Sequence, residues 1–446
     1  MQFLFDRFAE TPGQTAFVDG TRRTTYGEVL VATAEHEQRL DAVGVPRGSV
    51  VVVVADYSPD VFCFLMALAR RACVAVPATP TSVIERDTIL KLSEAGWIAE
   101  FDAGDRAPRL TPTGTRPTNQ LLVRFLETGN PGLILFSSGS TGLPKAILHN
   151  FDLVAEKVRK RGAPVVAIAF LLLDHFGGIN TILSITSGLG TVVTVSDRSV
   201  AGICRAIEAH RVEILPTTPS FLNLLVRSDM VKQFDLGSLK RITYGTEVMP
   251  QSTLDRLRQS FPNVLLQQTY GLSELGVLRS QSRPDGSLWV RIGGQGFQTK
   301  VVDDILWIKS EYAMVGYLNA PSPFDAQGWF NTQDKVEVEG EWFRILGRVT
   351  DLINVAGQKV YPAEIEEVIL ALDNVEDVAV YGEKHALLGQ IVVAKIVTRV
   401  PEAVASLKPR VRKACLARLA SFKVPSKVVL AEEGLYSVRL KKRRGS

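Results

Sequence analysis

The chain has 446 residues, of which 46% are hydrophobic, and its 51 basic and 47 acidic side chains give a formal net charge of +4. A chain of this length is expected to form two or three domains around a large buried core. The balanced charge argues against nucleic acid or a membrane surface as the main partner.

The four cysteines show no Cys-x-x-Cys spacing, and each has apolar or small neighbours: Cys63, Cys73, Cys204 and Cys415. We therefore expect free, buried thiols and a reducing compartment. The N-terminal segment lacks a basic region followed by a long apolar one, and the longest apolar run, residues 163–173, is too short to span a bilayer. These features predict a cytoplasmic protein without a membrane span.

The first half of the chain alternates between predicted strands and helices. Residues 50–55 include five consecutive valines and predict a buried strand, which is followed by a predicted helix over 59–71 and a strand over 74–76. The alternation continues with strands over 133–136, 165–172, 191–195 and 213–215 and helices over 201–210 and 220–227. This pattern is typical of parallel sheets with crossover helices and predicts an α/β fold.

The second half has shorter segments and more turns. Antiparallel strands are predicted over 289–292, 300–302 and 305–309, which indicates a small β-subdomain. Beyond Asp351 a compact α+β unit is predicted, with helices over 362–371 and 401–419 and strands over 375–381 and 392–397. We place the boundary near residue 350, so that domains 1–350 and 351–446 are joined by a linker short enough to act as a pivot.

Residues 137–145 read Ser-Ser-Gly-Ser-Thr-Gly-Leu-Pro-Lys and follow the apolar strand predicted at 133–136. Glycines allow the backbone to curl so that N–H groups point inward, hydroxyls add donors, and Lys145 adds a positive charge, an arrangement that suits a polyphosphate. Clusters of Gly, Ser and Thr are also common in plain surface turns. The P-loop of nucleotide triphosphatases is excluded, because Pro144 and Ala146 flank the lysine where that motif needs glycine and a hydroxyl residue.

Three further motifs follow in order: Tyr-Gly-Leu-Ser-Glu at 270–274, Gly-Trp-Phe-Asn-Thr-Gln-Asp at 328–334 and Gly-Arg-Val-Thr-Asp at 347–351. Together with the loop at 137–145 they resemble the motifs of the adenylate-forming superfamily of acyl- and aryl-CoA synthetases, amino-acid adenylation domains and luciferases. The motif style is closest to that of the acyl- or aryl-CoA ligases. The resemblance implies a large multi-layer α/β N-terminal domain with a small β-subdomain, followed by a small, mobile α+β C-terminal lid.

The resemblance also implies ATP and Mg²⁺ as cofactors. Ser138, Thr141 and Lys145 would hold the β- and γ-phosphates, and Glu274, together with Thr141, would bind the metal, because a hard cation prefers oxygen ligands. A solvated carboxylate is the alternative for Glu274. A Gly-x-Ser-x-Gly nucleophile elbow is disfavoured, because the spacing to Gly276 is one residue too long.

Asp334 would accept both ribose hydroxyls, since an ionised carboxylate only accepts hydrogen bonds, and Arg348 would assist it. Gln333 stands where the family usually has glycine. Tyr270 would stack on the adenine, with a packed core tyrosine as the alternative. The full set of nucleotide-site residues implied by the resemblance is Ser137, Ser138, Gly139, Ser140, Thr141, Gly142, Lys145, Gly245, Thr246, Glu247, Tyr270, Gly271, Ser273, Asp334, Arg348 and Gly357.

The substrate pocket is expected at His175, Phe176 and Gly177. CoA ligases of this type have a His or an aromatic residue that gates the acyl pocket, and His175 takes that place, although a lone His is more often structural. Amino-acid-activating relatives carry an Asp at the next position to pair the ammonium group, whereas this chain has Phe176. The resemblance therefore implies a small carboxylic acid without an α-amine.

Two residues concern the C-terminal domain. Lys441 is the candidate for the lysine that bridges the substrate carboxylate and the α-phosphate, although the family's Pro and Gly are missing nearby and a solvated basic tail is the alternative. Asp351 matches the family's hinge, and its rotation would bring Gly357 to the pantetheine arm.

Taken together, the sequence predicts an acid–thiol ligase that forms an acyl-adenylate and pyrophosphate from ATP. The acyl group would then pass to the phosphopantetheine thiol of CoA or of an acyl carrier protein. Two alternatives stay open: an adenylate-forming enzyme with a non-thiol acceptor, and a non-catalytic nucleotide-binding relative.

Overall fold

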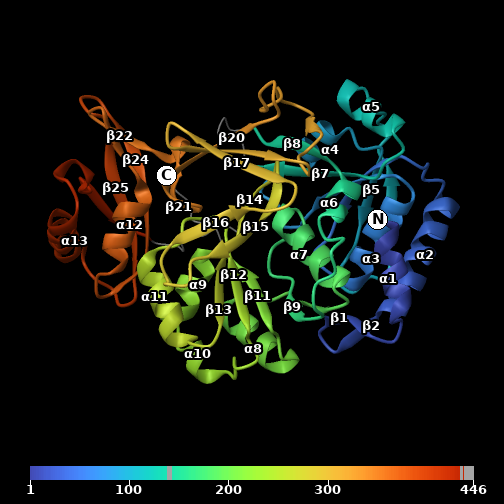
Figure 1. Cartoon of the computed structure of the whole chain (residues 1–446), viewed down its shortest axis with the longest axis horizontal. Coiled ribbons are helices and arrows are strands. Elements are labelled where there is room, and N and C mark those ends of the chain that lie inside the picture. Colours follow the sequence, from blue (N-terminus) through green and yellow to red (C-terminus); the bar gives the residue numbers. More distant parts are fainter. Residues whose placement is uncertain (138–142, 432–434, 436–446) are drawn as a thin grey trace.

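The computed structural model describes residues 1–137, 143–431 and 435. The predicted site residues Ser138, Gly139, Ser140, Thr141, Gly142 and Lys441 lie outside these ranges. The structure is an α/β protein with a large N-terminal domain and a smaller C-terminal domain, which Figure 1 shows at opposite ends of the long axis. This fold class confirms the prediction from the sequence, whereas the boundary at residue 350 stays a prediction.

The first sheet of the N-terminal domain is built around the five valines of β3, which are buried on both faces as expected of a parallel central strand. Its order is β19-β8-β7-β4-β3-β5-β6. The strands are β3 (Val50–Val54), β4 (Val74–Ala78), β5 (Trp97–Glu100), β6 (Arg109–Pro112), β7 (Gly132–Ser137), β8 (Lys145–Asn150) and β19 (Gly316–Tyr317). The antiparallel strand β8 was not predicted, and it turns the 137–145 segment into the connection of a β7–β8 pair.

The second sheet is parallel except at its edge, in the order β13-β12-β11-β9-β10-β1-β2. The strands are β1 (Thr15–Asp19), β2 (Arg22–Thr25), β9 (Val166–Ile168), β10 (Thr191–Thr194), β11 (Ile214–Thr217), β12 (Arg241–Tyr244) and β13 (Leu265–Gln268). The strand predicted over 165–172 was too long. The chain leaves the sheet after Ile168 and continues without regular structure to the start of α7 at Phe176.

Helices cover both faces of these two sheets (Figure 1). They are α1 (Gln2–Glu10), α2 (Tyr26–Val43), α3 (Pro59–Arg70), α4 (Arg86–Ser93), α5 (Gln120–Glu127), α6 (Phe151–Glu156), α7 (Phe176–Ser187), α8 (Val200–His210), α9 (Pro219–Arg227), α10 (Met230–Gln233) and α11 (Gln251–Ser260). The largest core cluster joins both sheets through α3 and α7, so α7 is apolar on most of its surface. All four cysteines are free and buried, which confirms the prediction of free, buried thiols.

An antiparallel sheet forms the β-subdomain, in the order β14-β15-β16-β21-β20-β18-β17. Its strands are β14 (Tyr270–Leu272), β15 (Gly276–Ser282), β16 (Trp289–Gly293), β17 (Phe297–Val302), β18 (Ile305–Ser310), β20 (Phe330–Glu339) and β21 (Trp342–Arg348). The three antiparallel strands predicted here are all present. In the part of the chain that the structure describes, no helix has the length and apolar character needed to cross a membrane.

The C-terminal domain has its own core and sheet, reached through the 3-10 turn η1 (Val349–Asp351). Its elements are β22 (Ile353–Val355), β23 (Gln358–Val360), α12 (Pro362–Leu370), β24 (Val375–His385), β25 (Gly389–Thr398), α13 (Val404–Arg418), η2 (Ser421–Lys423) and β26 (Lys427–Leu430). It docks on α9, where Arg227 donates hydrogen bonds of 2.7 Å to the carbonyls of Val375 and Leu370.

Candidate active site

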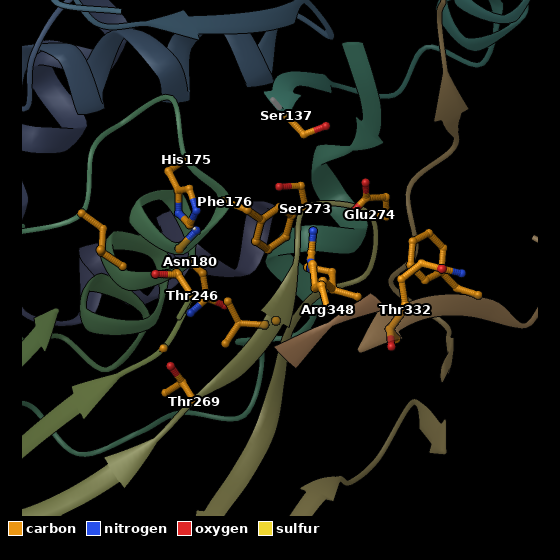
Figure 2. A pocket seen from close by; sticks show the side chains of 18 of the residues that line it. Ser137, His175, Phe176, Asn180, Thr246, Thr269, Ser273, Glu274, Thr332 and Arg348 are labelled. Carbon is orange, nitrogen blue, oxygen red and sulfur yellow. Dashed lines mark hydrogen bonds between the residues drawn. The ribbon is translucent and has the colours of Figure 1, made fainter. Parts of the chain in front are cut away.

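A cavity of about 820 Å³ lies where the three N-terminal sheets meet. Of the predicted site residues, twelve line it: Ser137, Lys145, His175, Phe176, Gly177, Gly245, Thr246, Gly271, Ser273, Glu274, Arg348 and Asp351. In Figure 2, His175, Phe176 and Asn180 of α7 lie on one side of this cavity, whereas Glu274, Arg348 and Thr332 lie on the other. Residues far apart in the sequence therefore converge on one site.

The two ends of the predicted phosphate loop are held next to each other by the β7–β8 pair. Ser137 is the last residue of β7 and Lys145 the first of β8, and these two residues are register partners. Asn319 fixes the far end of the loop, because its Nδ2 donates to the Pro144 carbonyl at 2.8 Å and its Oδ1 accepts from the Ala146 N–H at 2.9 Å. Asn319 was not among the predicted site residues.

Lys145 and Glu274 both contact Tyr317, which the sequence analysis also missed. The Lys145 ammonium lies 4.8 Å from the centre of the Tyr317 ring, a cation–π distance, and the Tyr317 hydroxyl donates to Glu274 Oε1 at 2.7 Å. Burial and the charge of Glu274 raise the pKa of Tyr317, so its hydroxyl keeps its proton. Tyr317 thus joins the two residues predicted to serve the polyphosphate and its metal.

Among the described residues, no group of three or more His, Cys, Asp or Glu side chains could hold a metal by itself. In the described part of the chain two carboxylates line the cavity, Glu274 and Asp351, and Glu274 is the one predicted to bind the metal. This donor set fits Mg²⁺, which keeps several waters and usually binds through one or two carboxylates plus the phosphates of the substrate.

Asp334 is buried next to the cavity lining and is bonded on both carboxylate oxygens. Its Oδ2 accepts from the Tyr270 hydroxyl at 2.5 Å, and its Oδ1 accepts from Arg348 Nε at 3.2 Å. Burial raises the pKa of Asp334, although Arg348 and the Tyr270 hydroxyl oppose this shift. Each carboxylate oxygen has a second lone pair, so the predicted ribose hydroxyls could still be accepted.

Tyr270 is buried and lies behind the residues that line the cavity, as a packed core tyrosine would. Its predicted stacking on adenine stays a prediction. Gln333, at the position that is usually glycine, lines the cavity with φ +61°. That left-handed backbone favours glycine, which accounts for the family's preference at this position.

The segment after β12 forms another part of the wall through Gly245 and Thr246. A Cβ atom at Gly245 would lie 2.5 Å from Thr269 Oγ1, so glycine is required for the close approach of β12 and the end of β13. The predicted residue Glu247 points elsewhere, since its carboxylate accepts from Ser220 Oγ at 2.5 Å and from the Ser220 N–H at 3.2 Å.

The start of α7 carries the predicted acyl-pocket residues. His175 is the N-cap, and its Nδ1 accepts from the Gly177 N–H at 3.0 Å, which leaves Nε2 as the protonated nitrogen. The Phe176 ring packs 5.1 Å from the ring of His149 in β8. Burial lowers the pKa of His149 to about 4, so this residue is a neutral side chain behind Phe176 and does not itself line the cavity.

Asp351 lines the cavity at the end of η1, whereas Gly357 lies in the β22–β23 turn with φ +85° and does not line it. Several polar cavity residues were missed by the sequence analysis: Asn180, Thr181, Thr217, Thr243, Thr269, Asn331, Thr332 and Tyr317. Thr217 ends β11, Thr243 is the last residue but one of β12 and Thr269 directly follows β13, and no local motif marks these three. Asn331 and Thr332 lie within the motif at 328–334 but were not among the predicted site residues.

Comparisons of the sequence identify related proteins. The AMP-binding enzyme family matches residues 4–318, and the AMP-binding enzyme C-terminal domain matches residues 364–442. Acyl-CoA synthetase 7 of Caenorhabditis elegans is 30% identical over 321 residues, which are 64% of this chain and 59% of that protein, so the match spans less than two thirds of its length. The 4-coumarate-CoA ligase 5 of Oryza sativa subsp. japonica is 25% identical over 456 residues, covering 89% of this chain and 84% of that protein.

Solved structures share the fold at lower identity. The o-succinylbenzoate CoA synthetase of Bacillus subtilis, in complex with its acyl-adenylate intermediate, has a TM-score of 0.78 at 20% identity, with 99% of this chain and 96% of that chain covered. An amide bond synthetase of Marinactinospora thermotolerans has a TM-score of 0.81 at 19% identity, with 99% and 97% covered. At 20% identity or less, these likenesses show a shared fold.

Proposed function

The chain belongs to the AMP-binding enzyme family, and from this premise we propose that it adenylates a carboxylic acid with ATP and passes the acyl group to a phosphopantetheine thiol. In the first half-reaction a carboxylate oxygen of the acid attacks the α-phosphorus, the bond to the β-phosphate oxygen breaks, and pyrophosphate leaves. In the second, the thiol sulfur attacks the acyl carbon, AMP leaves with the oxygen that the acid contributed, and the thiol proton passes to solvent.

The observation that carries this proposal is the pairing of Lys145 and Glu274 around Tyr317 at one side of a cavity whose other side is the start of α7. Negative charge on the departing pyrophosphate needs fixed positive charge, which Lys145 supplies at the end of the loop. Glu274 would hold Mg²⁺, whose own charge would lower the repulsion between the acid and the phosphates when it is bound.

Other residues position the reactants. The buried Asp334, fixed by Tyr270 and Arg348, would accept from the ribose, and Arg348 extends from β21 to the cavity. Lys441 is proposed to bridge the acid and the α-phosphate, and it lies outside the described residues. Gly357, on the small domain, is proposed to approach the pantetheine arm after a pivot at Asp351.

The acceptor distinguishes this proposal from its alternative. The curated relatives include an acyl-CoA synthetase and CoA ligases, which support a thiol, whereas one structural neighbour is an amide bond synthetase, which keeps an amine acceptor as the second candidate. The acid is proposed to lack an α-amine, because Phe176 is buried at 4% exposure and offers no partner for an ammonium group. The protein is proposed to act in the cytoplasm.

A panel of carboxylic acids, with pyrophosphate release as the readout, tests the first half-reaction. Adding CoA, a phosphopantetheinylated carrier protein or an amine, and identifying the product by mass spectrometry, then tests the acceptor. Acid-dependent pyrophosphate release with formation of a thioester is the expected result. An amide product would select the alternative, and nucleotide binding without pyrophosphate release for any acid would indicate a non-catalytic relative.

A further inference from the structure

A lysine outside the cavity lining is bonded to one of the residues that line it. Lys157 caps the C-terminal end of α6, and its Nζ donates to Asn180 Oδ1 at 2.9 Å. Asn180 belongs to α7 and lines the cavity together with Leu171, His175 and Phe176. None of the motifs in the sequence includes either residue, and the reaction described above uses neither.

The bond fixes the orientation of the Asn180 side chain. The Lys157 amine donates to the amide oxygen, which leaves the two N–H bonds of Nδ2 for another acceptor. The neighbouring Thr181 does not compete, because its hydroxyl donates to the Gly177 carbonyl at 2.8 Å. In the described part of the chain, Lys157 is the one hydrogen-bond partner recorded for the Asn180 side chain.

The charge around Lys157 is not neutralised by the protein. In the ranges that the structure describes, no carboxylate lies within ion-pair distance of its Nζ, and the charged neighbour that acts on it, Arg279, is also positive. Burial lowers the pKa of Lys157 to about 7, with Arg279 contributing in the same direction. Lys157 is therefore a half-buried amine that is protonated in about half of the molecules near pH 7, and in the described part of the chain its Nζ donates to Asn180 Oδ1.

The surrounding wall is polar for an acyl pocket. Beside the apolar Leu171, Phe176, Pro216 and Val277, the cavity is lined by hydroxyl groups from the ends of the second sheet: Thr217, Thr243, Thr246 and Thr269. Figure 2 shows Asn180, Thr246 and Thr269 on the same side of the cavity as His175. A wall of this composition suits a substituted acid better than an unsubstituted alkyl chain.

We propose that the acid carries an oxygen acceptor at the end remote from its reacting carboxylate, and that Asn180 Nδ2 binds this oxygen while Lys157 orients the amide. This inference rests on the proposed function and names the substrate class of that same cavity. The acceptor is a hydroxyl, carbonyl or carboxylate oxygen. A second carboxylate on the acid would also favour the protonated form of Lys157. Lys157 is a positioning residue, because it acts through Asn180.

The test uses acids that differ only at the remote end: 4-methyl-, 4-hydroxy- and 4-carboxybenzoic acid, and the same three substituents on cinnamic acid. Pyrophosphate release gives kcat/KM for each, and calorimetric titration in the presence of a non-hydrolysable ATP analogue gives binding without turnover. We expect the hydroxy or carboxy acid to exceed the methyl acid by about tenfold or more in kcat/KM, mainly through KM. A preference for hydroxy over carboxy acids would identify a neutral acceptor, and the reverse a second carboxylate.

Asn180→Leu should bring the ratio between acceptor-bearing and methyl acids close to one. Lys157→Met should lower the same ratio, and Lys157→Arg should restore most of it, which a purely structural role would not require. Lys160→Met, an exposed change four residues beyond the end of α6, serves as the control and should leave the ratio unchanged.

Equal use and equal binding of methyl and acceptor-bearing acids by the wild-type protein would overturn the inference, as would an Asn180→Leu protein that keeps the preference. These outcomes are separate from failure of the proposed function. If the acids bind with the expected order but release no pyrophosphate, the inference stands and the adenylation proposal fails. If pyrophosphate is released without discrimination, the adenylation proposal stands and the inference fails.

Discussion

The hydroxyl of Tyr317 donates a 2.7 Å hydrogen bond to Glu274, while the ring of the same tyrosine lies 4.8 Å from the Lys145 ammonium. Tyr317 belongs to the two-residue strand β19. This strand pairs with β8, which begins at Lys145, the last residue of the predicted phosphate loop. One side chain thereby sets the separation of a cation and an anion that come from motifs far apart in the sequence.

Removing either charge should lower acid-dependent pyrophosphate release while the protein stays folded. Lys145→Ala and Glu274→Ala are each expected to reduce kcat by about 10²-fold, because fixed groups that stabilise transition-state charge are commonly worth that much. Glu311→Ala, an exposed glutamate on the neighbouring turn, is the matched control. Wild-type turnover in the Glu274→Ala protein would remove this residue from the site.

Tyr317 offers two graded variants. Tyr317→Phe removes the hydroxyl bond to Glu274 but keeps the ring beneath Lys145, so we expect a loss of about tenfold or less in kcat/KM for ATP. Tyr317→Leu removes both contacts and should cost more, because the cation–π contact is lost as well. Steady-state kinetics over a range of ATP and Mg²⁺ concentrations measures both. Identical kinetics for the Phe and Leu variants would show that the ring has no part in holding Lys145.

Much of the fold could be predicted from local patterns in the sequence. The five valines of β3, the helix start at Pro59 and the α/β alternation each depend on neighbouring residues, and all are present in the structure. The predicted site residues Lys145, Glu274 and Arg348 meet at one cavity because they belong to ordered motifs. Strand β8 was not predicted, because its apolar run of three residues, Ala146 to Leu148, is short and directly follows a segment rich in Gly and Ser.

The missed cavity residues share a different cause. Thr217, Thr243 and Thr269 come from three different parallel strands, and their meeting depends on the order of strands in the sheet, which no local pattern encodes. Tyr317 lies in β19 and Asn319 follows two residues later. This strand has two residues, which is too short for an alternating pattern of apolar and polar residues. Glu247, which was predicted for the nucleotide site, accepts a hydrogen bond from Ser220 and does not line the cavity, and its role stays a prediction.

His149 predicts a pH dependence of stability. Burial lowers its pKa from 6.5 to about 4, so below pH 6.5 the unfolded chain binds a proton that the folded chain does not. The free energy of unfolding should therefore fall as the pH drops from 6.5 towards 4, by about 3 kcal/mol from this group when the shift is converted at 1.36 kcal/mol per pKa unit.

Urea unfolding across that pH range measures the effect. His149→Leu removes the titrating group and should flatten the dependence relative to the wild type, whereas the exposed control His385→Leu should leave it unchanged. A His149→Leu protein with the same acid slope as the wild type would show that carboxylates alone account for the acid sensitivity.

Asp351 predicts a separation of the two half-reactions. It ends η1, between β21 and the small domain, and also lines the cavity, so a rotation there would move the small domain relative to the site. Asp351→Pro fixes φ and should trap one orientation, retaining pyrophosphate release in a single turnover while thioester formation falls. Asp351→Ala, which keeps backbone freedom, is the control. Thioester formation at the parental rate by the Pro variant would place the pivot elsewhere or exclude a rotation.

The proposed adenylation is tested most directly by following the oxygen atoms of the acid. With a substrate acid whose carboxylate is labelled with oxygen-18, attack on the α-phosphorus followed by transfer to the thiol must leave one labelled oxygen in the released AMP. Mass spectrometry of the AMP, with unlabelled acid as the reference, is therefore expected to show a shift of one oxygen-18 in step with thioester formation. Unlabelled AMP, or label appearing in inorganic phosphate with ADP as the second product, would contradict the formation of an acyl-adenylate by this protein.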